Sequence, residues 1–324
     1  MTDAVLFACA LRTDVGNVVL RSDASIVAAL RAQEPAWVHL AADAPGLRKW
    51  IATWLGYLDP HVLTALLADE TRPRAMPLND GLMLILRGVN LNDGEEPEDM
   101  VSVRMWLEPA RIVTVARRRL ASLDDMRIGL ESGRGPTRAG AFLCDVVDHL
   151  GNRIETFLRD LDEEVDALEE NVMTDHSADL RSRITETRRR IVSFRRHIAP
   201  QRDALSLLAQ ANVRMLDETD HRRLFEAHDR LVRTVEELDA MRERLQVVKD
   251  ELQAALADRL NRNLFVLSVI SAIFLPLGFL TGLMGINVAG IPGADWPMAF
   301  WTFCSGLAIV LALQLLILRL IRWI

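Results

Sequence analysis

The chain has 324 residues, of which 50% are apolar and 26% are charged, and at about 150 residues per domain this length predicts about two units. With 38 basic and 45 acidic residues the net charge is −7, so no basic excess indicates a nucleic-acid partner. The apolar residues gather at the C-terminal end, because residues 264–324 contain no charged side chain except Asp295, Arg319 and Arg322. This distribution excludes a wholly soluble protein, and it excludes a protein that lies mostly in the membrane.

Residues 1–140 mix short β-patterned runs with helical ones. We expect strands at 5–11, 18–21, 36–41, 82–90, 101–107 and 112–116, and helices at 46–55, 60–68 and 123–131. Asp80-Gly81 and Asp93-Gly94 are turn signals between them. The pattern predicts an α/β domain with a mixed sheet. The first residues lack the basic segment and the long apolar run of a signal peptide, so we expect this domain to be cytoplasmic.

Residues 141–263 are helical in pattern, and the first two helices differ in charge. A helix expected over 141–171 carries seven acidic residues and no basic one between Asp160 and Glu170. The next, expected over 177–212, carries eight arginines from Arg181 to Arg202 against one acid. The opposite charges favour an antiparallel hairpin. An acidic site that attracts cations is the alternative.

A third helix is expected to be much longer. No Gly or Pro occurs between Pro200 and Pro276, and leucine recurs every seven residues from Leu224 to Leu252, which is a heptad pattern. The pattern continues without a breaker into the apolar C-terminal part. It predicts one helix over 219–284, about 100 Å long, in which a cytoplasmic stalk becomes the first membrane helix.

Two apolar segments, 264–284 and 298–318, have 21 residues each and no charge, which is enough to span a bilayer. Arg259 and Arg262 precede the first and Arg319 and Arg322 follow the second, whereas the loop 286–297 has no basic residue. By the positive-inside rule both termini are cytoplasmic and the loop is external. Two helices cannot enclose a water-filled path, so conduction would need an oligomer with the stalk helices as its seam.

One face of the first membrane helix combines leucines with small residues. Its positions are Leu264, Leu267, Ser271, Leu275, Gly278, Gly282 and Gly285. The Gly-x-x-x-Gly pair is typical of closely packed membrane helices. Small residues between leucines also suit a pore wall, and both interpretations stay open on these residues alone.

The end of that helix is more specific. The tripeptide Gly285-Ile286-Asn287 follows a Phe-x-Pro-x-x-Phe run at 274–279. This resembles the CorA superfamily of divalent-cation transporters, in which Gly-Met-Asn closes the first of two C-terminal helices. Ile286 departs from that methionine and is similar to the zinc-transporter (ZntB-like) branch, as are the Gly-Ile-Pro-Gly of 290–293 and the segments 70–74, 86–90 and 98–102.

The resemblance implies a CorA-like homopentamer in the cytoplasmic (inner) membrane that carries divalent cations, zinc first, through a pore lined by five first helices. It implies domains at 1–140, 141–263 (hairpin and stalk) and 264–324 (pore). Asn287 would hold the hydrated ion at an outer ring with Gly285 and Ile286, and Asp250 would belong to a regulatory metal site. Deeper pore positions carried over are Thr281, Gly278, Leu275, Leu267, Leu264 and Asn261.

The two apolar segments contain few side chains that could bind a metal ion. Neither span has a charge to offset dehydration of an ion, so the ion should keep much of its water. Zinc prefers His and Cys, and the first span has neither, so zinc rests on the resemblance, as does proton coupling. A magnesium or cobalt channel of the same fold and a membrane-tethered scaffold stay open. No catalytic or cofactor-binding motif indicates an enzyme.

Overall fold

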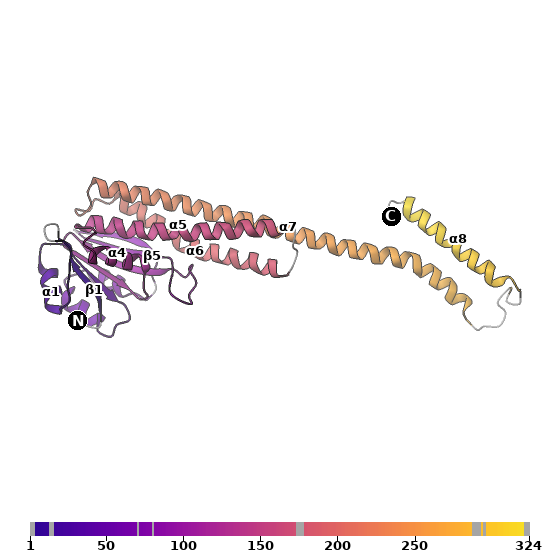
Figure 1. Cartoon of the computed structure of the whole chain (residues 1–324), viewed down its shortest axis with the longest axis horizontal. Coiled ribbons are helices and arrows are strands. Elements are labelled where there is room, and N and C mark those ends of the chain that lie inside the picture. The colour runs from indigo at the N-terminus through magenta and orange to yellow at the C-terminus, as the bar shows by residue number, and fades with distance from the viewer. Residues whose placement is uncertain are drawn as a thin grey trace. The chain divides into compact units, whose positions relative to one another are not determined.

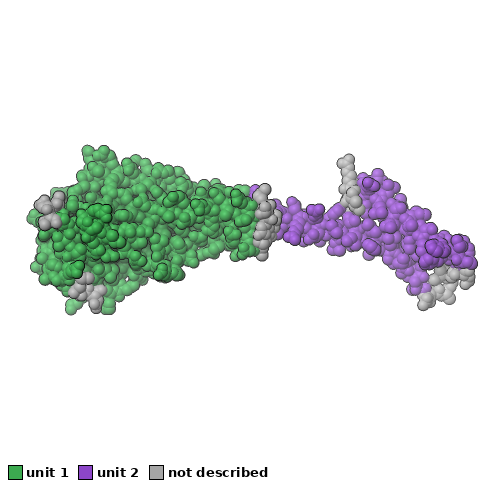
Figure 2. All heavy atoms as spheres, viewed as in Figure 1, with its two compact units in different colours: residues 1–249 green, residues 250–324 purple. Residues whose placement is uncertain are grey.

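The computed structural model describes residues 4–12, 16–69, 71–79, 81–172, 178–286, 293 and 296–320. The chain divides into two compact units, residues 1–249 and 250–324 (Figure 2). The division falls inside one continuous helix, α7 (Glu218–Met284), which has 67 residues. The sequence predicted this helix over 219–284, and the absence of Gly and Pro before Pro276 explains why it is uninterrupted.

The first unit is built on a mixed sheet. Its strands are β1 (Val5–Ala10), β2 (Val18–Val19), β3 (Ala36–Ala41), β4 (Arg74–Leu78), β5 (Gly81–Gly88), β6 (Val101–Glu108) and β7 (Arg111–Ala116). Their order is β2-β1-β3-β7-β6-β5-β4. Among the pairings of the described strands, β3–β7 is parallel and the other five are antiparallel. Strand β4 was not predicted; it contains Pro77 and lies at the sheet edge, where a missing N–H is tolerated.

Three short helices share a hydrophobic core with one face of the sheet: α1 (Asp23–Arg31), α2 (Leu47–Trp54) and α3 (Pro60–Leu67). Ile26, Trp50 and Val62 pack there with Val38 and Val113. Helix α1 was not predicted, although its start carries a local signal. The Ser22 side chain accepts a hydrogen bond from the Ser25 N–H in a capping box.

Long helices occupy the other face. They are α5 (Ala139–Val172) and α6 (Ala178–Gln210), with α4 (Ala121–Glu131) beside α5. Trp37 of β3 lies with its ring centroid 5.0 Å from that of Phe142 on α5, and its Nε1 donates to Thr114 Oγ1 at 2.9 Å. Since Trp37 and Val38 are adjacent and face opposite layers, the strand alternates as expected for a sheet covered on both sides.

Helices α5 and α6 form the antiparallel hairpin that the sequence predicted. Phe157 lies 4.7 Å from Phe194 between ring centroids, and further along the Thr187 hydroxyl donates to Glu164 at 2.5 Å. The residue numbers of contacting pairs therefore increase along α5 as they decrease along α6, so the two helices are antiparallel. The two helices and the first half of α7 run side by side (Figure 1).

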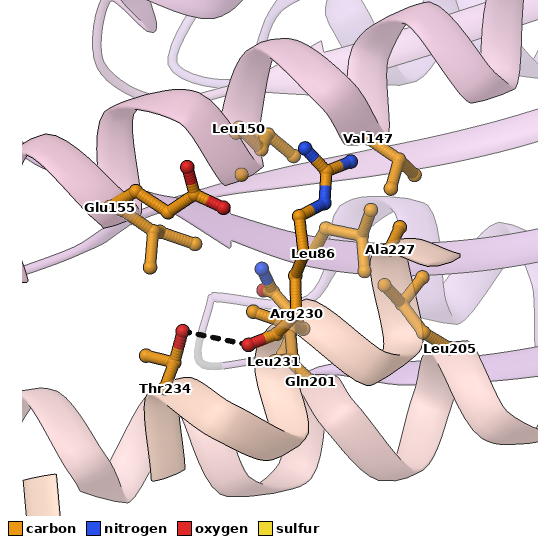
Figure 3. A pocket seen from close by; sticks show the side chains of 12 residues that line it. Leu86, Val147, Leu150, Glu155, Gln201, Leu205, Ala227, Arg230, Leu231 and Thr234 are labelled. Carbon is orange, nitrogen blue, oxygen red and sulfur yellow. Dashed lines mark hydrogen bonds between the residues drawn. The ribbon is translucent and has the colours of Figure 1, made fainter. Parts of the chain in front are cut away.

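The heptad of α7 is buried inside the chain. Leu224, Leu231, Leu238 and Leu245 are at most 4% exposed. Around Leu231, side chains of α5, α6 and β5 converge on α7 (Figure 3). The cavity left among them is about 10 Å³, room for one water molecule at most. The apolar heptad face of residues 224–248 is covered by the chain's own helices, so a seam between stalk helices would have to use another face of α7.

The second unit contains the apolar helices. The C-terminal part of α7 and α8 (Ala299–Leu320) each include an 18-residue window, with mean hydropathy of 2.3 and 2.2. In those windows 0% and 6% of residues are buried. Core helices of a soluble protein would be covered by their neighbours. Length, composition and exposure together support membrane spans at the predicted positions.

Candidate ion pathway

Helix α7 and the two residues that follow it hold every pore residue expected from the sequence that the structure describes. Leu264, Leu267 and Leu275 follow one another along one face of α7, and their side chains are 52%, 60% and 76% exposed. Asn261 is also exposed, one turn before this face begins. Among the described residues these three side chains stay more than half exposed, so the face is available to lipid, water or another subunit.

The small residues of this face are not used for packing within the chain. A Cβ atom added to Gly278 or to Gly282 would meet no atom within 4 Å. Glycines that let two helices approach would show close contacts at that position. The Gly-x-x-x-Gly pair therefore does not serve contact between α7 and α8, which leaves packing between subunits or a pore wall as its use.

Helix α7 ends at the tripeptide that suggested the family. The Gly285 N–H donates to the carbonyls of Thr281 at 3.0 Å and Gly282 at 3.1 Å, which closes the last turn. The Thr281 hydroxyl donates to the Leu277 carbonyl of its own helix at 3.0 Å. Ile286 is 49% exposed. Asn287, the proposed ion contact, lies outside the described residues.

This face is uncharged and mostly apolar, and its polar groups are hydroxyls and backbone carbonyls. Residues 264–286 contain no Asp, Glu, Lys, Arg, His or Cys. Over the described parts of the chain, no group of three or more His, Cys, Asp or Glu side chains has a metal-binding arrangement. Hydroxyl, amide and backbone carbonyl oxygens are suited to hydrated cations, since they can hydrogen-bond or replace single waters without a fixed charge.

The acidic run of α5 is held by arginines. Arg244 of α7 pairs with Asp162 at 2.9 Å, with Glu169 at 2.7 Å, and with Asp166. Arg190 of α6 pairs with Glu164. These contacts favour the structural interpretation of the acidic run over a cation-attracting site. The charge pattern predicted that α6 would pair with the acids of α5. Helix α7 also takes part, because its Arg244 pairs with three of those acids.

Metal ligands outside the membrane segments do not converge in the described chain. Asp250 is exposed on α7, and among the described residues it belongs to no group of three or more His, Cys, Asp or Glu side chains arranged for a metal. The Nδ1 atoms of His39, His221 and His228 have separate partners, namely Thr114 Oγ1 at 2.8 Å, the Ala209 carbonyl at 3.0 Å and Asp229 at 3.3 Å. His176 lies outside the described residues. Those three contacts give each of these imidazoles a separate structural partner.

Sequence reasoning missed one polar residue of the second unit. Gln314 of α8 places its amide nitrogen 3.4 Å from the backbone oxygen of Ala272 on α7. It carries the only side-chain amide between residues 299 and 320. A lone amide in an apolar span is a signal in itself, because such a group needs a partner in the bilayer.

These features define a class: a membrane protein with an α/β head, a long helix that continues into a membrane span, and a second span at the C-terminal end. A family model described as "CorA-like Mg2+ transporter protein" matches residues 32–320. The chain belongs to this family and is a divalent cation transporter rather than an enzyme.

Similar proteins cover nearly all of the chain. It is 37% identical over 90% of its length, and over 88% of the relative, to the divalent cation transporter CmaX of Pseudomonas aeruginosa. It is 34% identical to the zinc transport protein ZntB of Pectobacterium atrosepticum, over 87% of this chain and 85% of that protein.

Solved structures agree with the fold. A full-length CmaX structure superposes with a TM-score of 0.86 at 34% identity, covering 100% of this chain and 99% of that one. The CorA magnesium transporter of Methanocaldococcus jannaschii superposes with a TM-score of 0.82 at 16% identity, over 98% and 99% of the two chains. That second likeness shows the shared fold alone.

Proposed function

We propose that the chain assembles as a homopentamer that passes zinc ions across the cytoplasmic (inner) membrane, with five copies of α7 around the path. The observation that carries this is the exposed face of α7, where leucines are more than half exposed and an added Cβ at Gly278 or Gly282 would meet no atom of another helix within 4 Å in the described chain. Such a face lacks its partner in one protomer. A ring of subunits would enclose it.

The ion chosen is zinc because relatives at 34% identity over most of the chain are named zinc transport proteins. Magnesium is the second candidate, favoured by the description of the matching family. Residues 1–140 and 141–263 form the cytoplasmic head and stalk in this proposal, and 264–324 form the pore. Both termini are cytoplasmic, and the loop 286–297 is external.

The path would conduct an ion that keeps much of its hydration. Stripping a divalent ion costs far more than neutral oxygens return in an apolar span. Gly285 carbonyls and Asn287 amides would hold the water shell at the outer mouth, and Leu275, Leu267 and Leu264 would form constrictions that open or dewet. No step needs a resident cofactor.

The test is zinc flux into liposomes that contain the purified full-length protein and an internal zinc indicator. We expect influx above that of protein-free liposomes, and an imposed pH gradient to change its rate if protons are coupled. Competition with Mg²⁺ and Co²⁺ ranks the ions. Absence of zinc entry with clear Mg²⁺ entry would support the second candidate, and absence of both would contradict transport by this protein.

A further inference from the structure

Pro276 leaves a backbone acceptor without its helical partner in the first membrane span. It lies inside α7. In an α-helix the carbonyl of residue i−4 accepts from the N–H of residue i, and proline has no N–H. The affected carbonyl is that of Ala272. Within a bilayer there is no water to satisfy it, so such groups are met by neighbouring helices or polar side chains.

The structure supplies a donor to that same carbonyl. Gln314 Nε2 of α8 lies 3.4 Å from the Ala272 oxygen, a long hydrogen bond that joins residues 42 positions apart. An amide in α8 could have met any part of α7 or none. That it meets the carbonyl which Pro276 deprives of its donor gives the contact a specific physical reason.

The oxygen of the Gln314 amide indicates that this side chain does more than fill space between the helices. Its Oε1 atom is enclosed and has no hydrogen-bond partner in the described chain. An enclosed acceptor without a partner costs about 1–3 kcal/mol, and a Met or Leu side chain of similar size would avoid this cost. The advantage of the amide therefore lies in its donor, which is the group that reaches Ala272.

We propose that Gln314 is a positioning residue that replaces the hydrogen bond removed by Pro276 and so fixes the direction of α7 beyond the proline. This rests on the proposed function only in assigning α7 to the ion path. The segment after Pro276 carries Gly278, Thr281 and the Gly285 tripeptide. Loss of the contact lets that segment move against α8, which changes the outer mouth of the path.

The test is a double-mutant cycle of Gln314→Met and Pro276→Ala in the full-length protein, read by hydrogen–deuterium exchange of the amides at 277–284. Gln314→Met should speed exchange there about threefold to fifteenfold, which is the free energy of hydrogen bonds between membrane helices, about 0.6–1.7 kcal/mol, converted to a ratio of rates. Pro276→Ala restores the N–H that the Ala272 carbonyl lacks. In that background the Gln314→Met change should have little or no effect.

Thr302→Val is the matched control, because the Thr302 hydroxyl donates to the Met298 carbonyl of its own helix at 3.1 Å and does not reach α7. Oligomer mass should be the same in all variants. Equal effects of Gln314→Met in both backgrounds, or no effect in either, would overturn the proposal. A cycle that behaves as expected while zinc flux is unchanged would keep the contact and contradict the placing of α7 in the ion path.

Discussion

His39 shows how burial of one side chain makes the stability of the head depend on pH. Burial lowers its pKa to about 4, opposed by its contact with Thr114. The folded state thus binds this proton less readily than the unfolded state, whose pKa is about 6.5. Its contribution is complete above about pH 6.5 and is lost as the pH falls toward 4.

We therefore expect the head to lose up to about 2 kcal/mol through His39 between pH 7 and pH 5. The His39→Gln protein should show a smaller drop in Tm over the same range, measured by thermal unfolding in detergent. The remaining drop includes His197, whose pKa burial and nearby arginines also lower to about 4. His61→Gln, at an exposed position on α3, is the control. Equal pH dependence in wild type and His39→Gln would contradict this account.

Asn287 is the residue on which the proposed outer ring depends. Asn287→Ala removes an amide oxygen and two N–H donors from each subunit. Because the preceding span offers no charge, we expect zinc flux in liposomes to fall at least tenfold, with unchanged oligomer mass. Flux at the wild-type rate would mean that the ring is structural and that the ion path lies elsewhere.

Ile286→Met tests whether the middle residue of the tripeptide chooses the ion. It restores the Gly-Met-Asn sequence of the magnesium members. Ile286 is 49% exposed at the end of α7. We expect no gain of Mg²⁺ flux, because the residue should pack outward rather than contact the ion. A gain of Mg²⁺ flux at the expense of zinc would show that this single side chain sets selectivity.

At the scale of elements, the buried heptad of α7 should contribute to folding rather than to assembly. Leu238 is 0% exposed among the chain's own helices. Leu238→Ala should cost about 2–5 kcal/mol and lower the Tm, while oligomer mass stays the same. Val247→Ala, at a 57% exposed position of the same helix, should change the Tm little. Dissociation into smaller species by Leu238→Ala would restore the heptad as a subunit seam.

For the whole molecule, assembly is the requirement that the proposed function makes first. Two spans cannot enclose a path, and in the described chain the leucines on one face of α7 are more than half exposed. We expect one symmetric species of five subunits by native mass measurement in mild detergent. A monomer would remove any pore formed by α7.

Topology is the second requirement at this scale. Arginines flank both spans on the same side, and the loop 286–297 has none. In a variant whose native cysteines are replaced, Ala294→Cys should react with a membrane-impermeant maleimide in intact cells. A cysteine in the head, for example Ala32→Cys, should react only after the membrane is opened. The reverse pattern would invert the assigned orientation.

The sequence by itself determined most of the elements, although α1 and β4 were not predicted. Period-two runs located β1, β3, β5, β6 and β7, and an uninterrupted helical pattern located α7 almost to its last residue. The two spans followed from length and absence of charge. These signals are local, since each depends on side chains a few positions apart. The tripeptide ending at Asn287 supplied the family, and relatives at 34–37% identity agree with it.

Only the tertiary structure decided which elements meet. The heptad of α7 looks the same whether it faces another subunit or its own α5 and α6. The acids of α5 could pair with any arginine, and three of them form ion pairs with Arg244 of α7. Gln314 and Ala272 are 42 residues apart, so no local pattern links them. Periodicity fixes which face of an element is apolar or charged, whereas the partner of that face is chosen by long-range packing among groups that the sequence leaves equivalent.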